Sequence, residues 1–197
     1  MRIPIASVCV FAGSNPGTDP AFEDAAVQLG RMLALRGINV VYGGGKVGLM
    51  GLLADAALDA GGTVTGVIPK DLFDREVGHT GLTELLVVES MHERKLAMAD
   101  RSQAFIALPG GVGTFEELFE AFTWTQLGIH AKPVGVLDVH GFYTPLLGFL
   151  DDVVSQGFLT PTHRAHFLAG TDPDELLSRF QSWEPTTVSK WLGPEDR

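Results

Sequence analysis

One stretch decides the fold of this chain: Phe105-Ile106-Ala107-Leu108-Pro109-Gly110-Gly111-Val112-Gly113-Thr114-Phe115-Glu116-Glu117. Its apolar start, 104–108, is typical of a strand that is buried on both faces of a sheet. A turn with three glycines follows, and Thr114 is predicted to open a helix with Glu116 and Glu117 in its first turn. Because this connection directs backbone N–H groups outward at a helix N-terminus, the stretch predicts an anion-binding turn.

The two glutamates after the glycine turn admit two interpretations. Thr114-x-x-Glu117 fits a capping box, in which both side chains satisfy the free N–H groups at the helix start. A cradle for phosphate alone, however, would not place two carboxylates beside its anion. The field of the helix N-terminus keeps such a carboxylate ionised, which suits a nucleophile or a stabiliser of positive charge. We therefore predict a phosphate-binding turn next to a working carboxylate, with the capping box as the structural alternative.

Strands and helices are predicted to alternate along the rest of the chain. Uniformly apolar runs predict strands over 7–12, 39–42, 63–68, 85–88, 104–108, 133–139 and 167–168. Helical spacing predicts helices over 20–36, 48–60, 91–101, 114–128, 143–156 and 172–180, whereas 69–83 has no clear period and is predicted to be a loop. This order is typical of an α/β fold, a parallel sheet of about seven strands with helices on both faces. We expect one domain over residues 1–182 and a polar tail over 183–197.

Three glycine-rich turns follow predicted strands, at 13–17, 43–48 and 110–113. In doubly wound sheets, ligands bind beyond the carboxyl ends of the strands, where the strand order reverses. The second turn, Gly43-x-Gly45-x-x-Gly48, formally fits a dinucleotide fingerprint, but it follows the second strand and lacks a well-placed acidic residue. It favours a nucleotide phosphate or ribose over an intact NAD, and tight packing of strand on helix is the structural alternative. The turns make Gly13, Ser14, Gly44, Gly45 and Gly110 candidate binding residues.

Composition narrows the class of protein. The 197 residues are 45% hydrophobic with a mean hydropathy of +0.18, which indicates a globular chain with a sizeable core. The net charge of −10 argues against nucleic acid or an anionic membrane as a partner. No apolar run approaches the roughly 20 residues of a membrane span, and the start of the chain does not resemble a signal peptide. The single cysteine, Cys9, is expected in the core, so we expect a cytoplasmic protein. The histidines are scattered, so no metal site is expected.

A predicted helix over 91–101 carries two more candidates, Arg94 and Lys95. Arg94 shares a stripe with Met91 and Met98, which places it either at the helix edge, extended toward water, or in a polar pocket. The stripe by itself favours the edge. Ser90-x-x-Glu93 predicts a second capping box, which gives Glu93 a structural role.

These motifs, in this order, resemble the "Lonely guy" (LOG) family of cytokinin riboside 5′-monophosphate phosphoribohydrolases. The resemblance rests on the glycine-rich segment 43–51, the Met91-x-x-Arg94-Lys95 helix, the Pro109-Gly110-Gly111-x-Gly113-Thr114-x-x-Glu117 element and the segment 123–128. It covers residues 7–180. The family is also catalogued as lysine decarboxylase-like, but no lysine here has the context of a pyridoxal-phosphate enzyme.

The resemblance implies a single-domain Rossmann-like fold, a homodimer with its site near the subunit interface, and no cofactor. It implies cleavage of the N-glycosidic bond of a purine nucleoside 5′-monophosphate, to free base and ribose 5-phosphate. Arg94 and Glu117 match the family's catalytic pair. The substrate-binding positions that match are Glu76, Arg94, Lys95, Gly111, Val112, Gly113, Thr114, Glu116, Glu117 and Thr123. Val112 stands where many relatives carry tyrosine.

Two other functions remain open from the residues. A non-catalytic carrier of a nucleotide or phosphorylated cofactor would use similar glycine turns without needing the arginine–glutamate pair. An NAD-dependent oxidoreductase is the weakest reading, because the dinucleotide fingerprint is incomplete.

Overall fold

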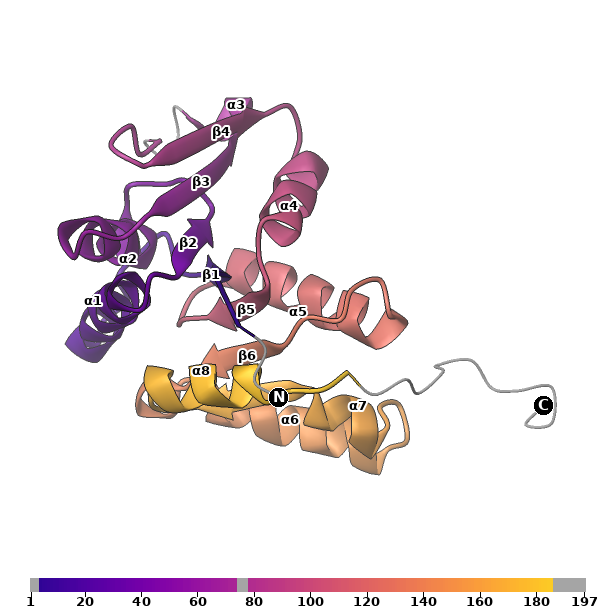
Figure 1. Cartoon of the computed structure of the whole chain (residues 1–197). Coiled ribbons are helices and arrows are strands. Elements are labelled where there is room, and N and C mark those ends of the chain that lie inside the picture. The colour runs from indigo at the N-terminus through magenta and orange to yellow at the C-terminus, as the bar shows by residue number, and fades with distance from the viewer. Residues whose placement is uncertain (1–3, 74–77, 186–197) are drawn as a thin grey trace.

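The computed structural model describes residues 4–73 and 78–185 (Figure 1). The described strands are β1 (Ser7–Phe11), β2 (Asn39–Tyr42), β3 (Val64–Pro69), β4 (Glu84–Val88), β5 (Ala104–Ala107), β6 (Val134–Leu137) and β7 (Phe167–Gly170). The described helices are α1 (Pro20–Leu35), α2 (Gly48–Asp59), α3 (Lys70–Phe73), α4 (Met91–Asp100), α5 (Val112–Leu127), the 3₁₀ turn η1 (Val139–Gly141), α6 (Thr144–Ser155), α7 (Pro161–Ala165) and α8 (Pro173–Gln181).

The described strands form one seven-stranded sheet in the order β4-β3-β2-β1-β5-β6-β7, and every pair is parallel. This confirms the α/β class, the parallel sheet and the number of strands. The order reverses between β1 and β5, because the chain first builds outward from β1 to β4 and then returns to β5. The loops that follow β1 and β5 therefore flank the crevice in which such sheets bind ligands.

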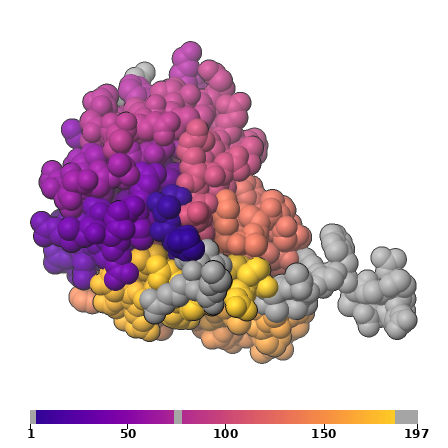
Figure 2. Space-filling model, in the orientation of Figure 1, coloured from indigo at the N-terminus to yellow at the C-terminus, as the bar shows by residue number. Residues whose placement is uncertain are grey.

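Helices cover both faces of the sheet (Figure 1). Successive side chains of β1 point to opposite faces, so Val8 and Val10 pack with α1, α2 and α8, whereas Cys9 and Phe11 pack with α4, α5 and α6. Cys9 is fully buried, as expected. Figure 2 shows the C-terminal segment packed directly against the N-terminal helices, and Arg36 at the end of α1 pairs with Asp174 of α8. The first and last elements thus belong to one packed body.

The sequence missed two short helices. Helix α3 is a single turn inside the predicted loop 69–83, and α7 has five residues, so neither is long enough to show a helical period. Helix α7 did carry a start signal, because the Thr160 hydroxyl caps it by accepting from the His163 N–H. The packed part also extends past the expected boundary at 182, since Trp183 is buried and its ring lies edge-on to His166. None of the helices in the described part of the chain is long and apolar enough to cross a membrane.

Burial of His130 makes stability depend on pH. Its ring stacks on Phe105 and meets Trp124 edge-on. Desolvation, with a smaller contribution from the charge of Lys132, lowers the pKa of His130 to about 4. Between pH 6.5 and about pH 4, His130 is protonated in the unfolded chain but not in the folded chain. The free energy of unfolding therefore falls as the pH falls from 6.5 toward 4.

We expect His130→Phe to retain stability at acidic pH. Because the ring is only partly buried, solvent screening reduces the effect to about 1–2 kcal/mol. Urea unfolding at pH 7.5 and pH 4.5 measures it: the free energy of unfolding should fall less for the variant than for the wild type. Equal slopes with pH would contradict the assignment to His130.

Candidate active site

A cavity of about 300 Å³ opens beyond the carboxyl ends of β1 and β5, where the strand order reverses. It is lined by Ala12, Gly13, Ser14, Met50, Leu72, Met91, Arg94, Gly111, Val112, Gly113, Thr114, Glu116 and Glu117. The structure thus brings together the first and third glycine turns, Arg94 of α4 and both glutamates of α5. A second cavity of about 270 Å³ shares Gly13, Ser14 and Gly111 with the first, and the contacting rings of Phe22 and Phe142 form part of its lining.

Helix α5 begins two residues earlier than the sequence predicted. Its first residue is Val112, and Gly111 is the N-cap. Thr114 is therefore the third residue and Glu117 the sixth, so the predicted capping box is wrong and Glu117 lies beyond the first turn. Gly111 has no side chain with which to cap the helix, so its first N–H groups line the cavity without a side-chain cap. This is the anion-binding geometry that the glycine turn indicated.

Gly110 allows the two glycine turns to meet. A Cβ at this position would lie 2.7 Å from Cβ of Thr114 and 2.9 Å from the backbone nitrogen of Gly13. The Gly13 N–H in turn donates to the Pro109 carbonyl at 3.1 Å. The turns after β1 and β5 are therefore packed backbone against backbone, and together they form one wall of the cavity.

Gly113 offers a test of whether α5 approaches a ligand closely. A Cβ at Gly113 would meet no protein atom within 4 Å, and the residue is helical, so Gly113→Ala adds a methyl group to open space in the cavity. We expect the free energy of unfolding to rise by about 0.4–1 kcal/mol, because the unfolded chain loses freedom. We also expect KM for the nucleotide to rise at least about tenfold, because the methyl group blocks a phosphate at the helix start.

Gly148→Ala is the matched control, because Gly148 is an exposed glycine inside α6 with no protein atom near its Cβ position. It should gain stability without a change in KM. Chemical denaturation and steady-state kinetics on both variants measure the two effects. An unchanged KM in Gly113→Ala would contradict the prediction that the substrate phosphate binds at the start of α5.

Arg94 points into the molecule. The side chain is only 6% exposed, one Nη donates to the Gly43 carbonyl at 3.3 Å, and the other lies 3.8 Å from the Met91 sulfur. The extended position at the helix edge that its stripe favoured is wrong, and the polar-pocket alternative is confirmed. Nε is buried without a hydrogen-bond partner in the protein, so the guanidinium has capacity left for a ligand.

Gly43 makes the position of Arg94 possible. A Cβ at Gly43 would overlap the Arg94 guanidinium. The first glycine of the 43–48 turn therefore serves Arg94, a role that the dinucleotide fingerprint did not suggest.

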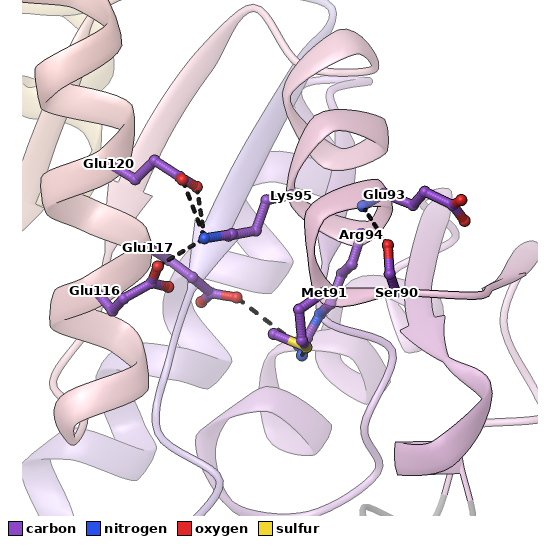
Figure 3. Close-up of polar contacts among 8 residues, drawn as sticks. All are labelled: Ser90, Met91, Glu93, Arg94, Lys95, Glu116, Glu117 and Glu120. Carbon is purple, nitrogen blue, oxygen red and sulfur yellow. Dashed lines mark hydrogen bonds and ion pairs between the residues drawn. The ribbon is translucent and has the colours of Figure 1, made fainter.

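Glu117 faces Arg94 across the cavity (Figure 3). Its Oε1 lies 3.9 Å from Nη2 of Arg94, an ion pair that is too long for a direct hydrogen bond, and its side chain is 13% exposed. A buried guanidinium needs a nearby negative charge, and Glu117 supplies it. The structure thus holds a cation and a carboxylate close together in the lining of the cavity.

Lys95 points toward α5, where its ammonium meets Glu116 and Glu120 (Figure 3). Its ammonium lies 2.6 Å from Glu116 and 3.0 Å from Glu120, and Lys95 is not among the residues that line the 300 Å³ cavity. Desolvation, the largest single contribution, acts to lower the pKa of Lys95, but hydrogen bonds and charges from both glutamates outweigh it and raise the pKa. Lys95 therefore stays protonated.

The second glycine turn does not line either cavity at Gly44 or Gly45. Gly44 accepts a hydrogen bond from the His79 N–H, and Gly45 pairs with Gly78, so both hold the segment that returns after residue 77. The N–H groups of Leu49 and Met50 at the start of α2 donate to the Gly13 carbonyl. These contacts fit the packing alternative for Gly44 and Gly45, and a nucleotide phosphate or ribose beside this turn stays a prediction.

Two further candidates lie elsewhere. Thr123 is exposed on α5 and is not among the residues that line the cavity of its own chain. Glu76 lies outside the described residues. The predicted capping role of Glu93 is confirmed, because Ser90 accepts from the Glu93 N–H and the Glu93 carboxylate accepts from the Glu89 N–H. Within residues 4–73 and 78–185, no group of three or more His, Cys, Asp or Glu side chains is placed to hold a metal ion.

Sequence reasoning missed several cavity residues. Met50 and Leu72 contribute apolar wall, and Phe22 and Phe142 bound the adjoining cavity. Met91 was noted in a helical stripe and in the Met91-x-x-Arg94-Lys95 motif but not as a cavity residue, although its sulfur lies 3.8 Å from the Arg94 guanidinium. Leu72 gave no signal, because it sits in a one-turn helix without a period.

Solved structures with the same fold include two molybdenum cofactor proteins. The molybdenum cofactor carrier protein from Chlamydomonas reinhardtii matches with a TM-score of 0.67 and 20% identity, over 89% of this chain and 96% of its own. The molybdenum cofactor binding protein from Rippkaea orientalis matches with a TM-score of 0.66 and 23% identity, over 91% of this chain and 98% of its own. At this identity they establish the Rossmann-like fold and no more.

Sequence relatives are much closer. The probable cytokinin riboside 5′-monophosphate phosphoribohydrolase LOGL1 of Oryza sativa subsp. japonica is 51% identical over 202 residues, covering 96% of this chain and 91% of its own. Cytokinin riboside 5′-monophosphate phosphoribohydrolase LOG1 of Arabidopsis thaliana is 48% identical over 178 residues, covering 90% of this chain and 84% of its own. The family model described as "Possible lysine decarboxylase" matches residues 50–180. The chain therefore belongs to the LOG family, as its glycine turn, its Arg94 helix and its Glu117 indicated.

Proposed function

We propose that this chain hydrolyses the N-glycosidic bond of purine nucleoside 5′-monophosphates, N6-modified ones included, and releases the free base and ribose 5-phosphate. The observation that carries the proposal is the buried Arg94 guanidinium facing Glu117 in a cavity that ends at the uncapped start of α5. The curated relatives that are about half identical to this chain carry the same activity in their names.

The start of α5 suits the 5′-phosphate. Gly111 and Gly113 offer backbone without side chains, and Ser14 adds a hydroxyl from the facing turn. From Gly113 to Glu117 the helix rises about 6 Å, which is comparable with the span from the 5′-phosphate to C1′ of a ribonucleotide. A phosphate bound at the helix start therefore brings the glycosidic carbon to Glu117.

Glu117 and Arg94 suit the bond-breaking step. Departure of the base leaves positive charge on C1′ and the ring oxygen, as in glycoside hydrolysis. The Glu117 carboxylate, preorganised in a largely buried site, stabilises that charge more than it stabilises the ground state. Arg94 orients Glu117, and a water molecule completes the hydrolysis at C1′.

We further propose a homodimer in which the outer stripe of α5 meets a partner. Val112 is 85% exposed, and the exposed Thr123 and Leu127 follow it at helical spacing on the side of α5 opposite the buried residues. Thr123 matches a substrate-binding position of the family but does not line the cavity of its own chain. A partner would bring Thr123 to the other subunit's cavity.

The dimer predicts that Leu127→Asp weakens association. A charge in the middle of an apolar interface costs several kcal/mol, so the variant should sediment as a monomer at micromolar concentration, where the wild type is a dimer. Leu35→Asp is the control, because Leu35 is an exposed leucine on α1, on the other face of the sheet. A wild type that sediments as a monomer would contradict the dimer.

We propose a cytoplasmic location without nucleic-acid or membrane partners. The net charge of −10 repels both polyanionic surfaces, and the single thiol is buried and cannot form an internal disulfide. Fractionation of cells that express the protein with a small C-terminal tag tests the location.

A chromatographic time course tests the reaction. Purified protein is incubated in parallel with AMP and with N6-isopentenyl-AMP, and free base and ribose 5-phosphate are quantified. Hydrolysis should release the two products in equal amounts. Base released from the N6-modified nucleotide at least as fast as from AMP supports a cytokinin-type preference. Release of base from AMP alone would support hydrolysis of the N-glycosidic bond but would make AMP the preferred substrate. Binding of nucleotide without product after long incubation would favour the carrier.

A further inference from the structure

Lys95, Glu116 and Glu120 form an ion-pair bridge between α4 and α5, which we call the Lys95 bridge. The ammonium lies 2.6 Å from Glu116 Oε1 and 3.0 Å from Glu120, and the Lys95 side chain is only 13% exposed (Figure 3). Both contacts are of hydrogen-bond length, whereas the neighbouring Arg94–Glu117 pair is separated by 3.9 Å. The bridge is therefore the tighter of the two links between these helices.

We propose that Lys95 and Glu120 are positioning residues that fix the separation of Arg94 and Glu117. This inference rests on the proposed function of the Arg94–Glu117 pair. Lys95 follows Arg94 directly on α4, and Glu116 precedes Glu117 directly on α5. Because each residue of the Lys95–Glu116 contact is the chain neighbour of one residue of the Arg94–Glu117 pair, the Lys95 bridge holds Arg94 and Glu117 at a set distance.

The geometry supports this role for two reasons. First, the 3.9 Å separation of Arg94 and Glu117 is too long for a direct hydrogen bond, whereas the contacts of Lys95 between the same two helices are of hydrogen-bond length. Second, the catalytic effect of a charged pair depends on its spacing, and an error of about 1 Å can cost a factor of roughly 100 in rate. Glu120 does not line the 300 Å³ cavity, and its carboxylate accepts a hydrogen bond from Lys95 at 3.0 Å.

Charge balance supports it as well. Glu116, Glu117 and Glu120 lie within five residues of one helix, beside a cavity that is to receive a phosphate dianion. Like charges at this spacing on a helix repel each other. Lys95 draws Glu116 and Glu120 to one cation on α4, which separates them from Glu117 and lowers the negative charge at the cavity rim.

Three variants separate positioning from substrate binding. Lys95→Met removes the charge at similar length, Glu120→Gln removes one arm of the bridge, and Lys95→Arg keeps the cation. We expect Lys95→Met to lower kcat roughly 10- to 100-fold and Glu120→Gln to lower it by a smaller factor, with KM for AMP within about twofold of the wild type. Lys95→Arg should retain most of the wild-type kcat. A Lys95 that bound the phosphate would instead show a KM increase of at least about tenfold in Lys95→Met and no effect in Glu120→Gln, which would overturn the proposal.

Charge reversal gives an independent check. Lys95→Glu places a third carboxylate beside Glu116 and Glu120, and adding Glu120→Lys restores opposite charges across the helices and pairs position 120 with Glu116 one turn away. The double variant should be at least about tenfold more active than Lys95→Glu alone. Additive losses would contradict the bridge. Circular dichroism and thermal melting of each variant show whether it is folded.

A structural measurement keeps the inference separate from the proposed function. In a crystal structure of Lys95→Met, the distance from Arg94 Nη2 to Glu117 Oε1 should differ from that in wild-type crystals by about 1 Å or more. An unchanged distance would overturn the positioning role whether or not the protein hydrolyses nucleotides. A wild type that releases no base while this distance does change would refute the proposed function and leave the bridge in place.

Discussion

Glu117→Gln is expected to lower kcat for base release at least about 1000-fold while KM changes by no more than a few-fold. Glutamine keeps the size and shape of the side chain but cannot balance the positive charge that develops on the sugar as the base departs. The lost interaction is one that forms in the transition state, so the loss should appear in kcat. Single-turnover measurements with excess enzyme, with AMP as substrate, would quantify it.

The fold should tolerate this change. Glu117 is the sixth residue of α5, and the N-cap is Gly111, so the loss of about 1 kcal/mol that follows removal of a cap does not apply. Glu23→Gln is the matched control, because Glu23 is an exposed glutamate on α1, away from the residues that line the cavity. A kcat for Glu117→Gln within tenfold of the wild-type value would show that Glu117 is not a catalytic residue.

The sheet could be predicted from sequence because its signal is local. Strand β5 is a run of apolar residues between a helix and a glycine turn, and each strand of a parallel sheet covered on both faces reads in the same way. The position of Cys9 followed from the same pattern. The crevice between β1 and β5 followed in turn, because ligand sites in such sheets lie where the order reverses.

The start of α5 could not be predicted because local preferences pointed to the wrong residue. Gly113 and the β-branched Val112 are poor helix formers, so the sequence predicted a turn there and a helix from Thr114. In the fold, close packing of Gly110 against Gly13 and Thr114 orients the chain so that the helix begins at Val112. The capping box that Thr114 and Glu117 offered as an alternative is therefore not formed, and Glu117 faces Arg94.

The side chains of α4 depended on partners far along the chain. Arg94 is oriented by the carbonyl of Gly43, 51 residues away, and Lys95 by Glu116 and Glu120, 21 and 25 residues away. A helical stripe of Met91, Arg94 and Met98 carries no information about those partners, so it favoured an arginine at the helix edge. Motif spacing predicted Arg94 and Lys95 as site residues, and only the fold shows that Arg94 lines the cavity whereas Lys95 contacts Glu116 and Glu120.

Arg94→Lys is expected to lower kcat/KM by roughly 100- to 1000-fold, although it keeps the positive charge. A lysine ammonium is a compact point charge and cannot contact the Gly43 carbonyl, the Met91 sulfur and the Glu117 carboxylate together, as the planar guanidinium does. Glu117 would lose its fixed orientation, and a few tenths of an ångström of extra freedom is costly in a preorganised site. Arg31→Lys, on the exposed face of α1, is the matched control.

The double variant Arg94→Lys/Glu117→Gln decides whether the two residues act as a unit. If Arg94 works by holding Glu117 in place, its replacement should cost little once the carboxylate is gone, so the double variant should be about as slow as Glu117→Gln alone. Initial rates of base release for the wild type, both single variants and the double variant complete the cycle. If the losses multiply instead, Arg94 acts on the substrate independently of Glu117, with its unpartnered Nε as the group that would reach the phosphate or the base.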